Sequence, residues 1–239
     1  MTEANADDCV YGDPQATLSA VIIGDSHATA YIPAVRSALE SRGWRIHVLN
    51  LGQCPIADVA VHIWGESGEF EACNDHRRWV EKEIDRLQAD LVIGASSYIS
   101  TTDRLLSENT GGAALDEWRG GLSQSFDRLS QLAASVVILA DVPRATCGEQ
   151  PWERPTSCVE SDQLSESSYL RIEGEAARAA GVDFIDTTAW FCALNTLICP
   201  VQIGSSLVRA DGGHLTGAYS HRLGPVLYEA LIDAGVIND

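Results

Sequence analysis

Five short runs rich in valine and isoleucine recur along the chain, and each lies next to a longer segment with helical periodicity. The runs occupy residues 19–24, 45–50, 90–95, 135–140 and 182–186. They are apolar almost throughout, as expected for parallel strands that helices cover on both faces. This alternation predicts an α/β fold of three layers, a sandwich whose central, mostly parallel sheet has five strands.

The helical segments carry apolar residues on one face, which we expect to pack against the sheet. These residues are Ile32, Val35 and Leu39 after the first strand, Val80, Ile84 and Leu87 before the third, and Leu223, Leu227 and Leu231 near the end. Pro225 predicts a kink, or a restart after Gly224, in the last helix. Because the sequence has no interdomain linker, we expect one domain over residues 1–239, with residues 1–17 as an N-terminal extension.

The charge of the chain argues against some classes of partner. Its formal net charge is -18 and its pI is near 4.5, which disfavours wrapping of anionic nucleic acid or binding to an anionic membrane surface. The 239 residues, 45% of them hydrophobic, are enough to bury a sizeable core. We therefore expect a globular protein without a nucleic-acid partner.

The cysteines bear on compartment and on metal binding. They are Cys9, Cys54, Cys73, Cys147, Cys158, Cys192 and Cys199. None stands in the CxxC spacing typical of zinc or thioredoxin-like sites, so we expect no metal. Several lie in loops that contain proline or glycine, where a disulfide can clamp the chain, and this favours an oxidising compartment. The alternative is a cytosolic protein with reduced, buried cysteines.

The sequence itself shows no export signal. No run approaches the ~20 apolar residues of a membrane span, and residues 1–8 lack the charged and apolar regions of a signal peptide. If the cysteines indicate export, the chain is part of a longer protein whose remainder carries the membrane or secretion signal. The resulting hypothesis is an extracytoplasmic domain, tethered to the membrane in the full-length protein.

The first predicted strand ends in Gly24-Asp25-Ser26-His27, where the helical pattern begins. Ser26 is therefore expected at a strand-to-helix turn, at the electropositive N-terminus of a helix. A hydroxyl in this position can attack an ester carbonyl while its own backbone N–H helps to hold the oxyanion. The alternative is an ordinary N-cap serine.

A second motif lies before the last helical pattern, where two glycines separate Asp211 from His214. This spacing lets the carboxylate accept a hydrogen bond from one ring nitrogen while the other nitrogen faces a serine. Taken alone, the motif also fits a glycine-rich surface turn followed by an ordinary histidine. In the first interpretation, Asp211 and His214 would form a Ser-His-Asp triad with Ser26, an arrangement that needs no cofactor.

The GDSHA sequence that begins at Gly24 and the DGGHLT sequence that begins at Asp211 resemble the first and last signature blocks of the SGNH (GDSL) hydrolase superfamily. The version DGGHLTGAYSHRL is most similar to the extracytoplasmic SGNH domain at the C-terminus of acyltransferase-three membrane proteins, which O-acylate envelope glycans and glycolipids. The resemblance extends from about Cys9 to the final helix. It implies a flavodoxin-like sandwich and two partners: the membrane acyltransferase domain of the same full-length protein as acyl donor, and a glycan or glycolipid acceptor.

The resemblance also implies residue roles. For the triad, these are nucleophile Ser26, base His214 and orienting carboxylate Asp211. Besides the N–H of Ser26, the family presents a glycine N–H after the second strand, where this chain has Gly52, and an asparagine after the third, where it has Ser96 and Ser97. Either hydroxyl is the expected substitute for the asparagine. A weakened oxyanion hole suits slow acyl transfer better than fast hydrolysis.

Proximity and the resemblance favour three disulfides, namely Cys54–Cys73, Cys147–Cys158 and Cys192–Cys199. Cys9 is then free or paired with the remainder of the protein. His27 is interpreted as a first-turn surface histidine outside the triad. Tryptophans on the long loops are expected either to line an acceptor groove or to anchor those loops; they are Trp64, Trp152 and Trp190.

The leading functional hypothesis is an O-acyltransferase domain, with acetyl as the expected acyl group, that works through an acyl-serine intermediate on a glycan or glycolipid hydroxyl. The same triad with water as acceptor is a carbohydrate O-acetyl esterase. A third hypothesis is not an enzyme at all: a binding module in which the fold serves only to recognise glycan.

Overall fold

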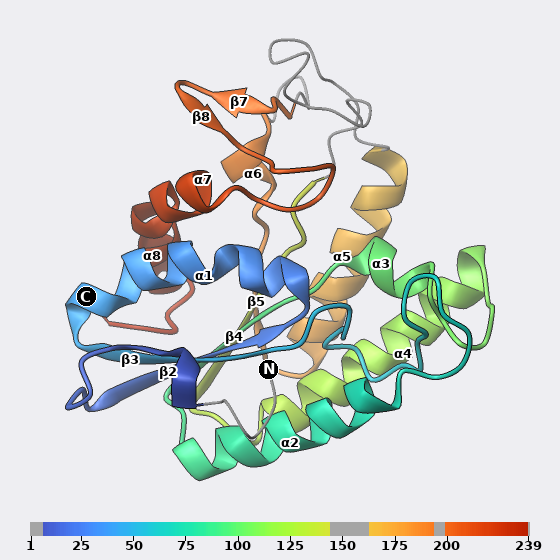
Figure 1. The fold of residues 1–239 in the computed structure, drawn as a ribbon, viewed down its shortest axis with the longest axis horizontal. Helices are drawn as coiled ribbons and strands as arrows, with labels where there is room; N and C mark the ends of the chain where they lie inside the picture. Colours follow the sequence, from blue (N-terminus) through green and yellow to red (C-terminus); the bar gives the residue numbers. More distant parts are fainter. Residues whose placement is uncertain (1–6, 144–162, 194–198, 239) are drawn as a thin grey trace.

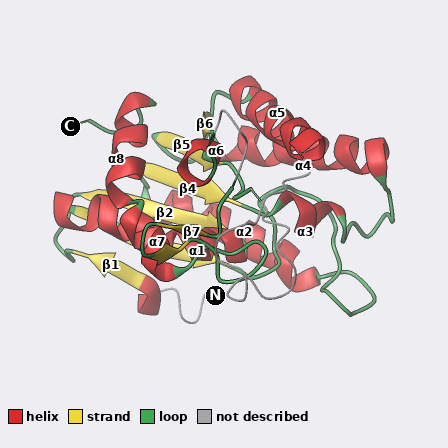
Figure 2. Cartoon of the chain, turned by 90° about the horizontal axis from the view of Figure 1, so that it is seen from above, coloured by secondary structure: helices red, strands yellow, loops and turns green. Residues whose placement is uncertain are grey.

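The computed structural model describes residues 7–143, 163–193 and 199–238. They form three layers, a central sheet between two layers of helices (Figures 1 and 2). The sheet has six strands in the order β1-β3-β2-β4-β5-β6. They are β1 (Val10–Gly12), β2 (Leu18–Gly24), β3 (Trp44–Asn50), β4 (Leu91–Ala95), β5 (Ser135–Leu139) and β6 (Asp183–Ile185). Five of these strands pair in parallel, and β1 pairs antiparallel with β3.

The predicted three-layer α/β fold with a mostly parallel sheet is confirmed, and each of the five predicted runs forms a strand. The sheet has a sixth strand, β1, in the segment interpreted as an N-terminal extension. Its three residues are too few to show a period, and they become a strand because β3 pairs with them, with Tyr11 opposite Ile46.

Two groups of helices cover the two faces of the sheet (Figure 1). One face carries α1 (Ser26–Leu39), α7 (Gly217–Arg222) and α8 (Gly224–Asp233), and the other carries α2 (Glu71–Leu87), α4 (Gly111–Leu129) and α5 (Gln163–Ala179). The remaining short elements are η2 (Glu40–Arg42), α3 (Tyr98–Thr102), α6 (Thr188–Phe191), β7 (Gln202–Ile203) and β8 (Ser206–Leu207). As predicted, a new helix starts at Gly224, and Pro225 lies in its first turn.

Successive residues of β2 enter different cores. Ala20 and Ile22 pack in the core beneath α1, whereas Val21 and Ile23 pack in the core on the α2 and α4 side. All four are at most 4% exposed. Burial on both faces is why the strand is apolar throughout instead of alternating with polar residues.

The carboxyl ends of the central strands lie in register, with Gly24 of β2 opposite Asn50 of β3 and Ala95 of β4. The helix after β2 covers one face of the sheet, and the helices after β4 lead to the other face. The edge between β2 and β4 is therefore a topological switch point, the place where open α/β sheets form their ligand-binding crevices.

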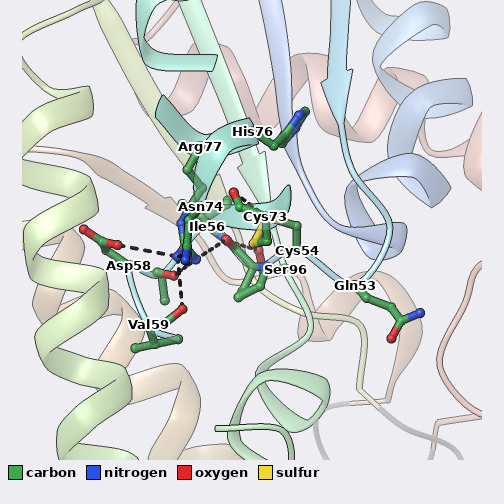
Figure 3. The surroundings of a disulfide bond; sticks show 12 residues. Gln53, Cys54, Ile56, Asp58, Val59, Cys73, Asn74, His76, Arg77 and Ser96 are labelled. Carbon is green, nitrogen blue, oxygen red and sulfur yellow. Dashed lines mark hydrogen bonds and ion pairs between the residues drawn. A yellow bond between two sulfur atoms is a disulfide. The ribbon is translucent and has the colours of Figure 1, made fainter. Parts of the chain in front are cut away.

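Two of the predicted disulfides are present, Cys54–Cys73 and Cys192–Cys199, and Cys9 is free and half-buried. Cys147 and Cys158 lie outside the described residues. Figure 3 shows how the first disulfide and the guanidinium of Arg77 fix the loop after β3; Arg77 donates to the carbonyl oxygens of Ala57 and Val59 at 2.8 and 3.0 Å. Among the helices that the structure describes, none combines the length and apolarity needed to cross a bilayer.

Candidate active site

Ser26 is the first residue of α1, directly after the turn that ends β2. Gly24 in this turn has a φ of 133°, and an added Cβ there would lie 1.9 Å from the carbonyl oxygen of Ala95. Only glycine allows this close approach. The N-cap is Asp25, whose carboxylate accepts the N–H of His27 at 2.8 Å. The side chain of Ser26 is therefore not used as the helix cap.

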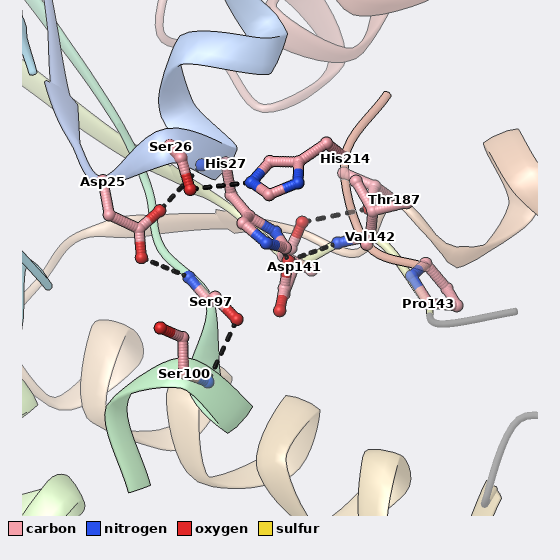
Figure 4. Close-up of polar contacts among 12 residues, drawn as sticks. Asp25, Ser26, His27, Ser97, Ser100, Asp141, Val142, Pro143, Thr187 and His214 are labelled. Carbon is pink, nitrogen blue, oxygen red and sulfur yellow. Dashed lines mark hydrogen bonds and ion pairs between the residues drawn. The ribbon is translucent and has the colours of Figure 1, made fainter. Parts of the chain in front are cut away.

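The structure brings the three predicted triad residues together, and Figure 4 shows the hydrogen bond between Ser26 and His214. Nε2 of His214 lies 2.8 Å from Oγ of Ser26, and Nδ1 of His214 lies 2.7 Å from Oδ2 of Asp211. A continuous hydrogen-bond chain thus runs from the serine through the imidazole to the carboxylate. This is the arrangement needed for the imidazole to take a proton from the hydroxyl.

The carboxylate of Asp211 is oriented by the turn in which it stands. Its Oδ1 accepts the backbone N–H groups of Gly213 and His214, both at 2.8 Å. Burial raises the pKa of this carboxyl, but these hydrogen bonds and the neighbouring His214 outweigh burial, so that the pKa of Asp211 lies below its ordinary value. The side chains of His214 and Asp211 are 40% and 57% exposed, so solvent and substrate can reach them.

The predicted oxyanion donors differ in their surroundings. Gly52 lies in the exposed turn after β3, and within the described parts of the chain its N–H and that of Ser26 donate to no protein acceptor. Oγ of Ser96 accepts the N–H of Ile56 at 2.9 Å. The N–H of Ser97 donates to Oδ2 of Asp25, and its Oγ caps α3 by accepting the N–H of Ser100 at 3.2 Å. Both serines therefore hold backbone segments at this edge.

His27 is only 5% exposed, so its interpretation as a surface histidine was wrong. Its Nδ1 forms a hydrogen bond with Oδ1 of Asp141, which also accepts the N–H of Val142 at 2.8 Å (Figure 4). Asp141 stands in neither of the two motifs that the sequence offers for catalysis. The available signal was its position two residues after β5, at the edge of the sheet where the triad stands.

Several other histidines and tryptophans are not part of this hydrogen-bonded cluster. His47 and His76 are buried, and Trp190 packs against the core beneath α1. Trp64 is 52% exposed, so it is not a buried loop anchor, and Trp152 lies outside the described residues. Within the described ranges, no group of three or more His, Cys, Asp or Glu residues is arranged to hold a metal ion.

Solved structures share this fold at low sequence identity. The periplasmic domain of a lipopolysaccharide acetyltransferase from Salmonella ser. Paratyphi A matches with a TM-score of 0.70 and 16% identity over 97% of this chain and 90% of that one. The acetylxylan esterase Axe2 from Geobacillus stearothermophilus matches with a TM-score of 0.56 and 14% identity over 94% of this chain and 98% of that one. A putative acylhydrolase from Bacteroides fragilis matches with a TM-score of 0.57 and 15% identity, over 95% and 91% of the two chains.

The fold is that of the SGNH hydrolases, an α/β class with esterase and acyltransferase members. The family model described as "SGNH domain (fused to AT3 domains)" matches residues 1–229. The chain belongs to this family of SGNH domains. A comparison with curated proteins finds no match.

Proposed function

We propose that the chain is an O-acyltransferase domain that carries an acyl group, most simply acetyl, on Ser26 and passes it to a hydroxyl of an envelope glycan or glycolipid. The hydrogen-bond chain from Ser26 through His214 to Asp211 is the observation that carries this proposal. Membership of a family fused to AT3 domains supports a membrane acyltransferase domain as donor partner. The names of the structural neighbours, a lipopolysaccharide acetyltransferase and an acetylxylan esterase, support a carbohydrate acceptor.

In the first half-reaction, Nε2 of His214 takes the proton of the Ser26 hydroxyl as Oγ attacks the carbonyl carbon of the acyl donor. Asp211 accepts the Nδ1–H bond and stabilises the imidazolium that forms. The tetrahedral intermediate then collapses, and the imidazolium returns its proton to the leaving oxygen of the donor. The product is an ester on Ser26 and a donor that has gained a hydrogen.

In the second half-reaction, a hydroxyl of the acceptor gives its proton to Nε2 of His214 and attacks the acyl-serine. The Ser26 oxygen leaves and recovers the proton from the imidazolium. The balance of the two steps is transfer of one acyl group from donor to acceptor. Water in place of the sugar hydroxyl gives hydrolysis by the same steps.

The oxyanion of both intermediates is proposed to be held by the N–H groups of Ser26 and Gly52. Gly24 and Asn50 are paired in register at the end of β2 and β3. Ser26 lies two positions after Gly24, and Gly52 lies two positions after Asn50, at the same sheet edge. Ser96 and Ser97 are given a supporting role, because the side chain of Ser96 holds the loop after β3 and that of Ser97 caps α3 after β4. Loss of one oxyanion donor typically costs ~10²-fold or more in rate.

An extracytoplasmic location fits the disulfides at Cys54–Cys73 and Cys192–Cys199, because such bonds persist in oxidising compartments. The AT3 fusion of the family supports tethering to a membrane in the full-length protein. Donor and acceptor would then meet on the outer side of the membrane.

Hydrolysis is the second candidate function, and one observation favours it. The side chains of His214 and Asp211 are 40% and 57% exposed, so water reaches the proposed base in the isolated domain. Transfer requires that the acceptor sugar displace this water.

The experiment that tests the proposal is release of nitrophenol from p-nitrophenyl acetate by the wild type and by Ser26→Ala, with and without oligosaccharide acceptors. Turnover that Ser26→Ala abolishes, together with acetylated sugar detected by mass spectrometry, is the expected result. Turnover without acetylated sugar would replace the transferase with an esterase. Labelling of the wild type by a fluorophosphonate separates both enzymes from a glycan-binding module, because a module without an activated serine does not react.

A further inference from the structure

A second histidine–carboxylate pair lies directly beside the triad, and the proposed mechanism does not use it. His27 and Asp141 are 5% and 6% exposed, and they are joined through Nδ1 of the histidine and Oδ1 of the carboxylate. The pair connects the first turn of α1 with the segment after β5. Figure 4 shows it beneath Ser26 and His214.

The ring of His27 contacts the segment that carries the proposed base. The ring centroids of His27 and His214 are 4.9 Å apart and the ring planes are tilted by 53°. A Cβ added to Gly213 would lie 3.3 Å from Cε1 and 3.4 Å from Nε2 of His27. The backbone just before the base therefore lies next to the Cε1–Nε2 edge of the His27 ring.

The orientation of the His27 ring is fixed from two sides. Asp141 holds Nδ1, and its own carboxylate is held by the N–H of Val142 at 2.8 Å. The backbone N–H of His27 donates to Asp25, so the residue is also tied to the N-cap of α1. A buried ring with this many constraints can act as a rigid support.

We propose that His27, oriented by Asp141, is a positioning residue for the base: its ring supports the backbone at Gly213 and thereby holds Nε2 of His214 against Oγ of Ser26. This inference rests on the proposed catalytic role of Ser26 and His214. It assigns a function to the histidine of the GDSH motif and explains why the residue before the base is a glycine. A displacement of the base by a few tenths of an ångström is enough to lengthen its 2.8 Å bond to Ser26.

A double-mutant cycle tests the contact itself. Gly213→Ala should lower kcat for p-nitrophenyl acetate by about 10-fold with KM unchanged, because the new methyl group pushes the turn off the His27 ring. His27→Ala should lower kcat by about 10- to 100-fold for loss of the support. In the double variant, Gly213→Ala should cost nothing further, since the methyl group then enters the space that the imidazole occupied.

Two matched controls exist in the chain. Gly212→Ala adds the same methyl group one residue earlier, where nothing lies within 4 Å, and kcat should equal that of the wild type. His76→Gln removes another buried histidine, whose Nε2 lies 3.0 Å from the carbonyl oxygen of Leu49, and it should lower stability while leaving kcat unchanged. Asp141→Asn retains an acceptor oxygen for Nδ1, so it should retain more activity than Asp141→Ala.

The proposal is overturned if the Gly213→Ala and His27→Ala effects on kcat are fully additive, or if His27→Ala lowers only the urea midpoint. A second readout is independent of turnover: the Nδ1 proton of His214, hydrogen-bonded to Asp211, is followed by ¹H–¹⁵N NMR of the imidazoles. A shift or loss of this resonance in His27→Ala, but not in His76→Gln, supports the positioning role. If wild-type turnover is absent, the proposed function fails, and an unchanged resonance in His27→Ala would separately exclude the support.

Discussion

The backbone N–H of Ser97 donates a 2.9 Å hydrogen bond to Oδ2 of Asp25, and this bond joins the turn after β4 to the turn after β2. The other carboxylate oxygen, Oδ1, accepts the N–H of His27 at 2.8 Å. Asp25 is 1% exposed. One buried carboxylate therefore connects the two sides of the switch point at which Ser26 stands.

Replacement of Asp25 is expected to lower stability according to how many of these bonds are lost. Asp25→Ala removes the helix cap and the bond to Ser97, and we expect it to lower the free energy of unfolding by about 2 kcal/mol or more. Asp25→Asn keeps one acceptor oxygen and can still cap α1, so its cost should be smaller. Urea denaturation of both variants measures the difference. Equal costs would show that the two hydrogen bonds are not what Asp25 contributes.

Most of the fold could be predicted because its signals are local. Each buried parallel strand is an apolar run, and each helix that covers it has an apolar face, so that the residues 19–24 and 32–39 are sufficient to indicate a strand and a helix. β1 could not be predicted, because three residues have no period and their strand conformation comes from pairing with β3. The strand conformation of β1 depends on residues of β3 that lie more than thirty positions away along the chain.

The same distinction applies to the site. Asp211 and His214 are three residues apart, and Ser26 marks the end of a strand, so each part of the candidate triad has a signature within a few residues. His27 is buried next to its hydrogen-bond partner Asp141, which is 114 residues away, and the Oγ of Ser96 accepts the N–H of Ile56, 40 residues away. These pairings arise from packing across the sheet edge, and no local pattern encodes them.

Asp211→Asn is expected to lower kcat by at least about 10²-fold. An amide in this position can present an N–H to Nδ1, which favours the wrong imidazole tautomer for accepting the serine proton. Because the Asp211 side chain is 57% exposed, we expect stability to change little. Steady-state kinetics with p-nitrophenyl acetate measure kcat, and thermal unfolding measures the stability of the variant. Unchanged kcat in a folded Asp211→Asn protein would remove Asp211 from the triad.

The disulfide between Cys54 and Cys73 is expected to stabilise the loop that follows the Gly52 turn. Its two cysteines are 19 residues apart, and closure of a loop of this size contributes about 3 kcal/mol in the chain-entropy description. The double variant Cys54→Ser with Cys73→Ser should lose about this much stability in urea denaturation. Cys9→Ser, at the free cysteine, is the matched control and should behave as the wild type. A double variant as stable as the control would contradict the prediction.

Arg104 is a fully buried guanidinium that fastens the same loop to α3. Its donors reach the carbonyl oxygens of Gln53, His62 and Ser100 at 2.6, 2.5 and 2.7 Å. An ammonium cannot span three separate acceptors, and each buried carbonyl left unpaired costs about 1–3 kcal/mol.

We therefore expect Arg104→Lys to lower the free energy of unfolding by about 2 kcal/mol or more, and to lower kcat because Gln53 is next to Gly52. Arg119→Lys is the control, since Arg119 pairs with Asp116 on the surface of α4 and its side chain is 43% exposed. Urea denaturation and steady-state kinetics of both variants provide the comparison. A kcat equal to that of the control would show that this loop does not help to hold Gly52 in the oxyanion hole.

His76 is expected to make the protein less stable as the pH falls. Burial lowers the pKa of this histidine from 6.5 to about 4, although its hydrogen bond to the carbonyl oxygen of Leu49 acts in the opposite direction. Above pH 6.5 the residue is neutral in both folded and unfolded chains, so it adds no pH dependence. Between pH 6.5 and 4 the unfolded chain binds a proton that the folded chain does not, which disfavours folding by on the order of 3 kcal/mol at pH 4. His76→Gln should therefore flatten the fall in unfolding free energy across this window, and an unaltered slope in urea denaturation at pH 7, 6, 5 and 4 would show that the imidazole takes up its proton without unfolding.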